Sequence, residues 1–150
     1  MLGHHLPQTP KLLQYQAIDL QNSLNNTINV FAVYVMHYVL EWYQEQGGVA
    51  AMEQQNRQKA KLLYDYLDES DFFLTSVNPL DRSLVNVIFN LPTTELLQQF
   101  LQECEEVGLL ALKGHREVGG VRASLYNALP LAAVERLVEK MRDFERKALT

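Results

Sequence analysis

The stretch LLALKGHREVGGVRASLYNAL, from Leu109 to Leu129, decides the fold that this sequence predicts. An apolar run ends at Lys113-Gly114, and a short polar loop with His115 and Arg116 follows. Gly119-Gly120 then lets the chain turn, because glycine reaches backbone angles that other residues adopt only at a cost. Beyond the turn, apolar and polar side chains alternate in the order Val121, Arg122, Ala123, Ser124, Leu125 and Tyr126. This period of two predicts a strand with one buried face, so we expect two strands around one glycine turn.

Two arginines and a histidine flank this turn, an arrangement that suits an anionic small molecule. Arginine stays charged at any ordinary pH and offers a rigid fork of donors to a carboxylate or phosphate. Arg122 and the pair His115-Arg116 are therefore the candidate binding residues. A plain hairpin with surface arginines is the alternative, and the spacing by itself does not separate the two.

The length, charge and cysteine content of the chain limit the classes of protein to which it can belong. The chain has 150 residues, of which 47% are hydrophobic, enough for one domain with a core. A formal net charge of −5 argues against nucleic acid as a partner, because nucleic-acid binding favours a strongly basic face. The single cysteine, Cys104, excludes a disulfide framework and a cysteine metal site within the chain. It lies on an apolar helical stripe and is interpreted as a small core residue.

Three local patterns bear on metals, targeting and membranes. His4-His5 has no third ligand nearby, so no metal site is expected. The N-terminal residues lack a basic start followed by an apolar run, so we expect no signal peptide. The longest apolar run, Val30 to Leu40 with His37 inside it, is too short to span a bilayer. The chain is therefore expected to be cytoplasmic, without a membrane as partner.

Periodicity predicts an α+β layer fold, with helices packed on one face of a small antiparallel sheet. The helices are expected at Val30–Gln46, Val49–Asp68, Thr93 or Thr94 to Val107, and from Pro130 onward. The strands are expected at Phe72–Val77, Arg82–Phe89, Leu109–Leu112 and Val121–Tyr126. The residues before the first helix have weak periodicity and two prolines, and are expected to form extended loop.

The predicted helices differ in how much of their surface is apolar. The helix from Val30 is apolar around much of its circumference, so we expect it to lie between two layers, with His37 as a partnered structural histidine. The last helix has one buried face, formed by Val134, Leu137, Val138, Met141 and Phe144. Asp143 and Lys147 are expected to pair on its outside. The helix from Val49 is ordinary and amphipathic, and Lys59 is placed on its polar side.

The glycine-turn motif resembles a known family. The segments Lys113-Gly114-His115-Arg116, Gly119-Gly120, Arg122-Ala123-Ser124 and Tyr126-Asn127-Ala128 resemble, in this order, the C-terminal region of the phosphoserine aminotransferases. These are pyridoxal-phosphate enzymes of fold type I, and the similarity runs from Thr27 to Phe144. It implies that residues 1–28 are the loop-like tail of an absent large cofactor domain. Residues 29–47 would then be a long bridging helix, and residues 48–150 the small C-terminal domain.

The resemblance also implies roles for individual residues. Arg122 matches the arginine that binds the substrate α-carboxylate, and His115 and Arg116 match a pair that contacts the phosphate of phosphoserine across a homodimer. Asn26 and Thr27 match a pair that contacts the cofactor phosphate from the neighbouring subunit. The family follows that pair with two prolines, whereas this chain continues with Ile28-Asn29, so simple helix capping is the alternative for Asn26 and Thr27.

A lysine that carries pyridoxal phosphate as a Schiff base is not found in this chain. None of the lysines stands in the Ser-x-Lys or Gln-Lys setting of the family; they are Lys11, Lys59, Lys61, Lys113, Lys140 and Lys147. By family order that lysine precedes the chain, so we assign no catalytic residue. The resemblance implies pyridoxal phosphate as the cofactor of the parent family, and whether the chain binds it alone stays open. The parent activity that the resemblance implies is amino transfer between phosphoserine and 2-oxoglutarate in serine biosynthesis.

Two alternatives stay open at this point. The chain could be a non-catalytic module that keeps anion binding, pairs with itself or pairs with a full-length enzyme, because its wide apolar helix would lack a partner. It could instead be a small regulatory α+β domain unrelated to the aminotransferases. Arg122 separates these, since an unrelated domain has no reason to hold this arginine beside a His-Arg loop.

Overall fold

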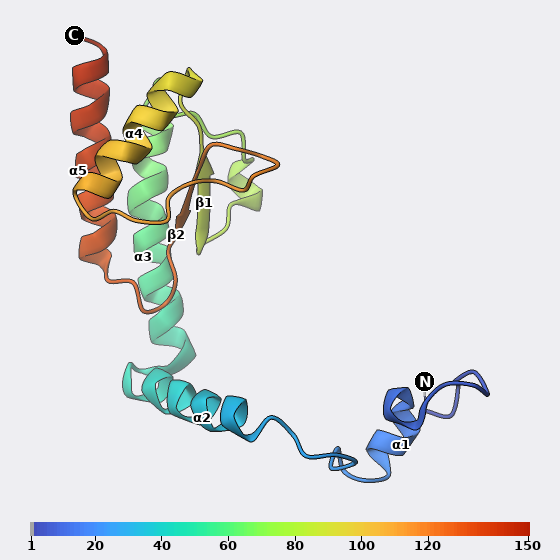
Figure 1. Cartoon of the computed structure of the whole chain (residues 1–150). Coiled ribbons are helices and arrows are strands. Elements are labelled where there is room, and N and C mark those ends of the chain that lie inside the picture. Colours follow the sequence, from blue (N-terminus) through green and yellow to red (C-terminus); the bar gives the residue numbers. More distant parts are fainter. Residues whose placement is uncertain (1) are drawn as a thin grey trace. The chain divides into compact units, whose positions relative to one another are not determined.

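The computed structural model describes residues 2–150 and divides into two units, one ending at Glu45 and one beginning at Gln46 (Figure 1). The first unit contains the 3₁₀ turn η1 (Lys11–Leu13) and the helices α1 (Tyr15–Asp19) and α2 (Val30–Glu45). The second contains α3 (Gly48–Glu69), η2 (Pro79–Asp81), β1 (Asn86–Phe89), α4 (Thr94–Glu106), β2 (Val121–Ser124) and α5 (Leu131–Ala148).

The second unit is built on a two-stranded antiparallel sheet, in which Val87 pairs with Ala123 and Phe89 with Val121. Alternate residues of a strand point to opposite faces, and these four side chains are all buried. The helices α3, α4 and α5 lie on one side of the sheet (Figure 1). The predicted α+β fold with helices on one face of a small antiparallel sheet is therefore confirmed.

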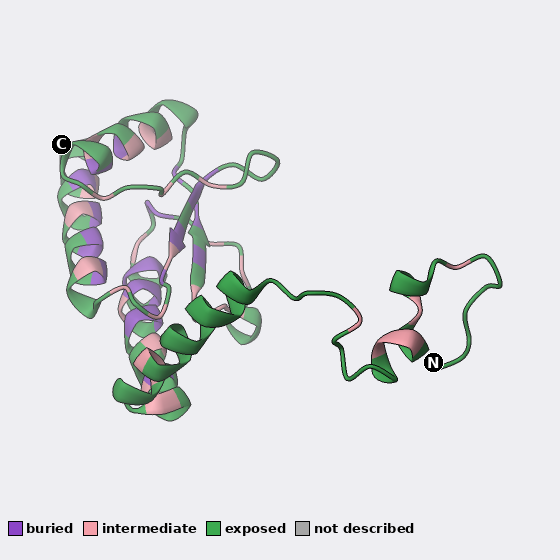
Figure 2. Cartoon of the chain, turned by 60° about the horizontal axis from the view of Figure 1, so that its bottom comes forward, coloured by how far each residue is buried: buried purple, intermediate pink, exposed green. Residues whose placement is uncertain are grey.

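The core between the sheet and the helices is rich in phenylalanine. Phe100 on α4 lies with ring centroids 5.3 Å from Phe73 and 5.2 Å from Phe144 on α5, and Phe73 lies 5.7 Å from Phe89. These edge-to-face contacts each add about 0.5–1.5 kcal/mol to the burial of the rings. All five residues predicted to form the inner face of α5 are buried, and Cys104 is too (Figure 2).

The predicted strand at Phe72–Val77 was wrong, because only an isolated bridge between Leu74 and Asn90 forms there. The hydroxyl of Ser70 accepts the N–H groups of both Phe72 and Phe73, which bends the chain just after α3. Phe72 and Phe73 are both buried, although a strand would direct them to opposite faces. The packing of these two rings in the core therefore determines the conformation of this segment.

The predicted strand at Arg82–Phe89 is shorter than expected and spans only Asn86–Phe89. Its first part is a loop because the hydroxyl of Ser83 accepts the N–H groups of Val85 and Asn86. A local side-chain bond of this kind competes with the strand ladder.

The apolar run Leu109–Leu112 is likewise not a strand. Ala111 has a φ of 59°, a left-handed conformation that breaks the period of two. The hairpin survives as two contacts: the N–H of Arg122 donates to the carbonyl of Leu112 at 2.8 Å, and Lys113 forms a bridge with Val121. The glycine turn therefore lies where the sequence predicts it, and it is followed by β2, which ends at Ser124 and not at the predicted Tyr126.

The first unit departs from the prediction in two ways. Its N-terminal part, expected as loop, contains η1 and the short helix α1. The helix α2 matches the predicted bounds within one residue, yet none of its residues is buried (Figure 2). His37, expected as a partnered structural histidine, is exposed and has Glu41 as its partner, with Nε2 3.3 Å from the carboxylate.

Two predicted charge positions also need correction. Asp143 pairs with Arg146 at 2.8 Å, and the Lys147 ammonium lies 3.9 Å from Glu103 of α4, so the expected Asp143–Lys147 pair does not form. Lys59 was placed on a polar face of its helix but is 2% exposed. Among residues 2–150, no helix combines the length and the apolar character needed to cross a membrane.

Candidate functional site

The glycine-rich loop at residues 113–120 is closed by backbone hydrogen bonds. The N–H of Gly114 donates to the carbonyl of Gly120 at 2.9 Å, and those of Val118 and Gly119 donate to the carbonyl of His115. A Cβ on Gly114 would lie 1.9 Å from the Gly119 oxygen, and one on Gly120 would lie 2.7 Å from the Phe89 oxygen. Only glycine fits at these two positions, so the turn holds one compact shape.

His115 and Arg116 project from the tip of this loop, and both are exposed. The N–H of Glu117 donates to His115 Nδ1 at 3.3 Å, which leaves the Nε2 edge of the ring for an external group. The Glu117 carboxylate lies 4.0 Å from His115 Nδ1 and is 76% exposed. The Glu117 carboxylate therefore faces water.

Arg122 projects from the exposed face of β2, in register with Ile88 of β1. Its backbone N–H donates to the carbonyl of Leu112 at 2.8 Å, on the edge of β2 that faces away from β1. Beside it, the hydroxyl of Ser124 donates to Asn86 Oδ1 at 3.2 Å. Within residues 2–150, neither Arg116 nor Arg122 forms an ion pair with a carboxylate of the chain. Both guanidinium groups are thus free to meet an external anion.

The candidate residues line adjoining cavities around the loop. A cavity of about 170 Å³ is lined by both His115 and Arg122, together with Ile88 and Asn90 of the β1 edge. His115 and Arg116 also line a second cavity of about 410 Å³ against α4. Arg122, Ser124 and Tyr126 line a third of about 400 Å³ against α5. His115 therefore shares one cavity with Arg122 and another with Arg116, whereas the two arginines line separate cavities.

Asn26 and Thr27 lie in the first unit, whereas the His115–Arg122 site lies in the second. Both are in the segment before α2, where the Asn26 amide donates to the Thr27 carbonyl at 3.2 Å. The side chain that caps α2 is Asn29, whose Oδ1 accepts the N–H of Ala32 at 3.1 Å. Capping thus falls to Asn29, and the cofactor role of Asn26 and Thr27 stays a prediction.

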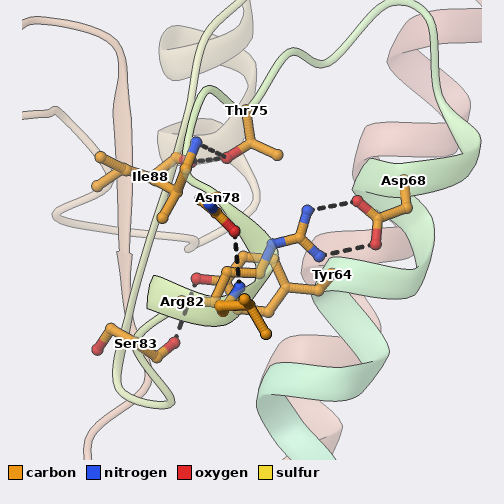
Figure 3. A network of polar contacts seen from close by, with 9 residues as sticks. Tyr64, Asp68, Thr75, Asn78, Arg82, Ser83 and Ile88 are labelled. Carbon is orange, nitrogen blue, oxygen red and sulfur yellow. Dashed lines mark hydrogen bonds and ion pairs between the residues drawn. The ribbon is translucent and has the colours of Figure 1, made fainter.

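A polar cluster between α3 and the loop that leads into β1 holds that loop in place (Figure 3). The guanidinium of Arg82 donates to both carboxylate oxygens of Asp68 at 2.7 and 2.5 Å and lies 4.5 Å from the Tyr64 ring centroid. The Tyr64 hydroxyl donates to the carbonyl of Ser83 at 3.2 Å. The hydrogen bonds from Arg82 hold the pKa of the Asp68 carboxyl below its usual value, and burial raises the pKa of Tyr64.

Sequence reasoning missed the role of Lys59, whose ammonium donates to three backbone carbonyls of the turn that follows β2. The apolar neighbours Ala60, Leu62 and Leu63 were a weak signal that this part of α3 is inside. A metal centre is not indicated, since the described part of the chain contains no group of three histidine, cysteine or carboxylate side chains that could hold an ion.

Known proteins are similar to this chain in both sequence and fold. The family model described as Aminotransferase class-V matches residues 1–137. A phosphoserine aminotransferase of Bacillus cereus is 50% identical over 145 residues, covering 97% of this chain and 40% of that protein. One from Idiomarina loihiensis is 48% identical over 147 residues, covering 98% of this chain and 41% of that protein.

Solved structures give the same result. The phosphoserine aminotransferase from Bacillus circulans subsp. alkalophilus superposes with a TM-score of 0.90 at 40% identity, over 98% of this chain and 41% of that one. The PLP-bound enzyme from Trichomonas vaginalis has a TM-score of 0.83 at 36% identity, over 91% of this chain and 39% of that one. The resemblance carried by the glycine-turn motif is confirmed, and the chain spans about 40% of the length of the relatives it matches.

The residues present do not fit a resident pyridoxal phosphate. Such a cofactor needs a desolvated lysine amine for its Schiff base. Lys59 is the buried lysine of the described chain, but its ammonium is engaged by three carbonyls. Lys61 and Lys140 are paired with carboxylates, and Lys113, beside His115, is exposed. The described residues therefore offer cations to an anion but no free buried amine that would hold the cofactor.

Proposed function

Because the chain belongs to the class-V aminotransferase family, we propose that it is the substrate-recognising C-terminal part of a phosphoserine transaminase. The whole reaction moves an amino group from phosphoserine to 2-oxoglutarate, giving 3-phosphohydroxypyruvate and glutamate in serine biosynthesis. The observation that carries this proposal is the cavity lined jointly by His115 and Arg122, with Arg116 on the adjoining cavity. The parent enzyme would be a cytoplasmic homodimer.

The two ends of the substrate need separate cations. Arg122 presents a planar fork that suits the α-carboxylate, which every amino-acid substrate of this reaction shares. His115 and Arg116 lie on the loop before β2, and across a homodimer they would meet the phosphate of a phosphoserine whose α-carboxylate is bound in the neighbouring subunit. The side-chain carboxylate of glutamate can use the same pair, so one site serves both halves of the reaction.

The chain alone is proposed to bind substrate without turning it over. Bond making at the amino group belongs to pyridoxal phosphate, which supplies the electron sink when it is bound. The chain's own residues bind and orient the substrate, which sets the direction in which its amino group points. Asn26 and Thr27 would complete the cofactor phosphate site of a neighbouring subunit in the assembled enzyme.

The experiment that tests this proposal is a titration of the ¹⁵N-labelled chain with phosphoserine, followed by NMR. Shifts are expected at the Arg122 side chain and along residues 114–120, and Arg122→Met should weaken binding by about tenfold or more, as loss of a charge-assisted bidentate contact does. Arg57→Gln is the matched control, because Arg57 is an exposed arginine of α3 paired with Glu53. Equal weakening by both variants, or no shift at all, would refute the recognition role.

A second candidate function, self-association, is favoured by α2. Its residues Phe31, Tyr34 and Val39 are exposed, and none of its 16 residues is buried. A continuous apolar surface of this kind favours association. Sedimentation over a concentration series should show a dimer or larger species that Phe31→Glu shifts toward monomer. Leu80→Glu is the control, since Leu80 is an isolated apolar residue, 93% exposed in η2.

A further inference from the structure

Lys59 reaches from the middle of α3 into the turn that follows β2. Its Nζ donates to the carbonyls of Leu125 at 3.2 Å, Tyr126 at 2.8 Å and Leu129 at 3.1 Å. An ammonium has three N–H donors and no acceptor, so these three carbonyls use its full capacity. Burial lowers the pKa of this ammonium, and the three carbonyl dipoles are what compensates the buried charge.

Asn56 holds the same turn one helical turn earlier on α3. Its Nδ2 donates to the side-chain oxygen of Asn127 at 2.6 Å. Residues three apart on a helix lie on the same face, so Asn56 and Lys59 act on the turn from one side. On the strand side, the N–H of Leu125 donates to the carbonyl of Val85 at 2.7 Å. The turn is therefore fixed by contacts from residues more than sixty positions away as well as by its neighbour strand.

The turn continues directly from the part of β2 that carries the binding face. Arg122, Ser124 and Tyr126 alternate along the chain and line one cavity of about 400 Å³. Side chains at alternate positions share a face only while the backbone keeps its strand direction. β2 ends at Ser124, and Lys59 binds the carbonyls of Leu125 and Tyr126, so its ammonium holds the two residues that directly follow the strand.

We propose that Lys59, assisted by Asn56, is a positioning residue for the carboxylate-binding face of β2. Its ammonium does not touch the substrate; it fixes the backbone of residues 125–129, and thereby the orientation of Arg122 and Tyr126. This inference rests on the proposed function in one respect, that Arg122 is the carboxylate ligand. The loop with His115 and Arg116 is closed by its own backbone bonds and does not depend on Lys59.

The test compares Lys59→Met with Lys61→Met in the full chain. Methionine keeps the length and apolar stem of the side chain but removes the charge, and Lys61 is an exposed lysine paired with Asp65 on the same helix. Acetate serves as the carboxylate probe and inorganic phosphate as the phosphate probe, each titrated into ¹⁵N-labelled protein. The readouts are the Arg122 Nε–Hε signal, the amides of residues 114–120, and amide hydrogen exchange of residues 125–129.

The expected result is selective. Lys59→Met should weaken acetate binding at Arg122 by about fivefold or more, as loss of a supporting contact loosens a site, with phosphate binding within about twofold. Amide exchange in residues 125–129 should rise by about tenfold or more, because the turn opens more often. Lys61→Met should change none of these readouts. Asn56→Ala, which keeps the ammonium, should produce a smaller change of the same selectivity, and it replaces Lys59→Met should that variant not fold.

Three outcomes would overturn the inference. Equal weakening of both probes would mean that Lys59 supports the whole unit and not this face. Unchanged acetate binding would mean that the turn does not orient Arg122. Should the wild-type chain bind neither probe, the proposed function fails by itself. The role of Lys59 is then tested on the ligand-free chain. If Lys59→Met changes neither the Arg122 Nε–Hε signal nor the amide exchange of residues 125–129, the positioning role is refuted.

Discussion

Arg122 of β2 lies opposite Ile88 of β1, and the carbonyl of Ile88 accepts a hydrogen bond from the hydroxyl of Thr75 at 3.0 Å. Arg122, the candidate binding residue, therefore lies on a strand whose partner β1 is hydrogen-bonded to Thr75 on its other edge. The N–H of Arg122 donates to the carbonyl of Leu112, so segments distant in sequence hold the backbone around this residue. An anion site of this kind is preorganised by backbone hydrogen bonding and needs little further ordering on binding.

Alanine substitutions at Gly114, in the loop 113–120, and at Gly108, just after α4, should differ in their effect on stability. The first creates a steric clash, and the second only strains the backbone. Gly114→Ala places a Cβ 1.9 Å from a backbone oxygen, whereas Gly108→Ala meets no atom within 4 Å and suffers only from its φ of 80°. We expect Gly108→Ala to lower the free energy of unfolding by about 1–2 kcal/mol. Gly114→Ala should cost more and also abolish phosphate binding. Urea unfolding measures both, and an equal cost for the two variants would contradict the assigned close approach.

The Asp68–Arg82 pair should make stability depend on pH in acid. The folded-state pKa of Asp68 is lowered, so its contribution is present above the unfolded value near about 4 and is lost as the pH falls through the folded pKa. Asp68 is half exposed, so the gain at pH 7 is under about 1 kcal/mol. Unfolding of wild type and Asp68→Asn should differ at pH 7 and converge in acid. A constant difference across this range would contradict the pair's role.

Phe100 should be a main determinant of stability, because it is fully buried and contacts the rings of Phe73 and Phe144. Phe100→Ala is expected to cost about 3–5 kcal/mol, through lost burial and the cavity left behind. Leu110→Ala, at a site that is 69% exposed, should stay within about 0.5 kcal/mol of wild type. Chemical denaturation measures both, and Phe100→Leu offers a milder variant should the alanine variant not fold.

Cys104 should be unreactive in the folded chain. Burial raises the pKa of its thiol to about 12, so almost none of it is thiolate at pH 8. A thiol-specific disulfide reagent should label no cysteine in native protein and one per chain in denaturant. Rapid labelling of the native chain would show that α4 opens frequently or that the thiol is accessible.

Borohydride reduction with pyridoxal phosphate should give no stoichiometric adduct, because the buried Lys59 is held by carbonyls and the cavity-lining Lys113 is exposed. Intact mass and peptide mapping measure the outcome, and the chain with cofactor and both substrates should show no turnover. A single adduct at Lys113 would require a cofactor site that the chain forms on its own. Steady glutamate production from phosphoserine would contradict the non-catalytic assignment.

Local pattern predicted a large part of this structure. The buried face of α5, the bounds of α2, α3 and α4, and the inner face of β2 follow from periods of 3.6 and 2, which depend only on neighbouring residues. The candidate binding residues could be named because two arginines and a histidine flank one glycine turn within eight positions of the sequence. At Ser70 and Ser83 the side-chain hydroxyl accepts backbone N–H groups and competes with the strand pattern. The strand predicted after Ser70 does not form, and the strand predicted from Arg82 is shortened.

The sequence by itself determined the helices and the glycine turn and named the candidate anion-binding side chains, since each is written in residues a few positions apart. The tertiary structure alone decided that Lys59 is buried beneath the turn after β2 and that Arg82 is clamped by Asp68. It also decided that His115 and Arg122 share a cavity. These relationships join residues that are distant along the chain or on separate elements, and their energies depend on desolvation and geometry that exist only once the layers have packed.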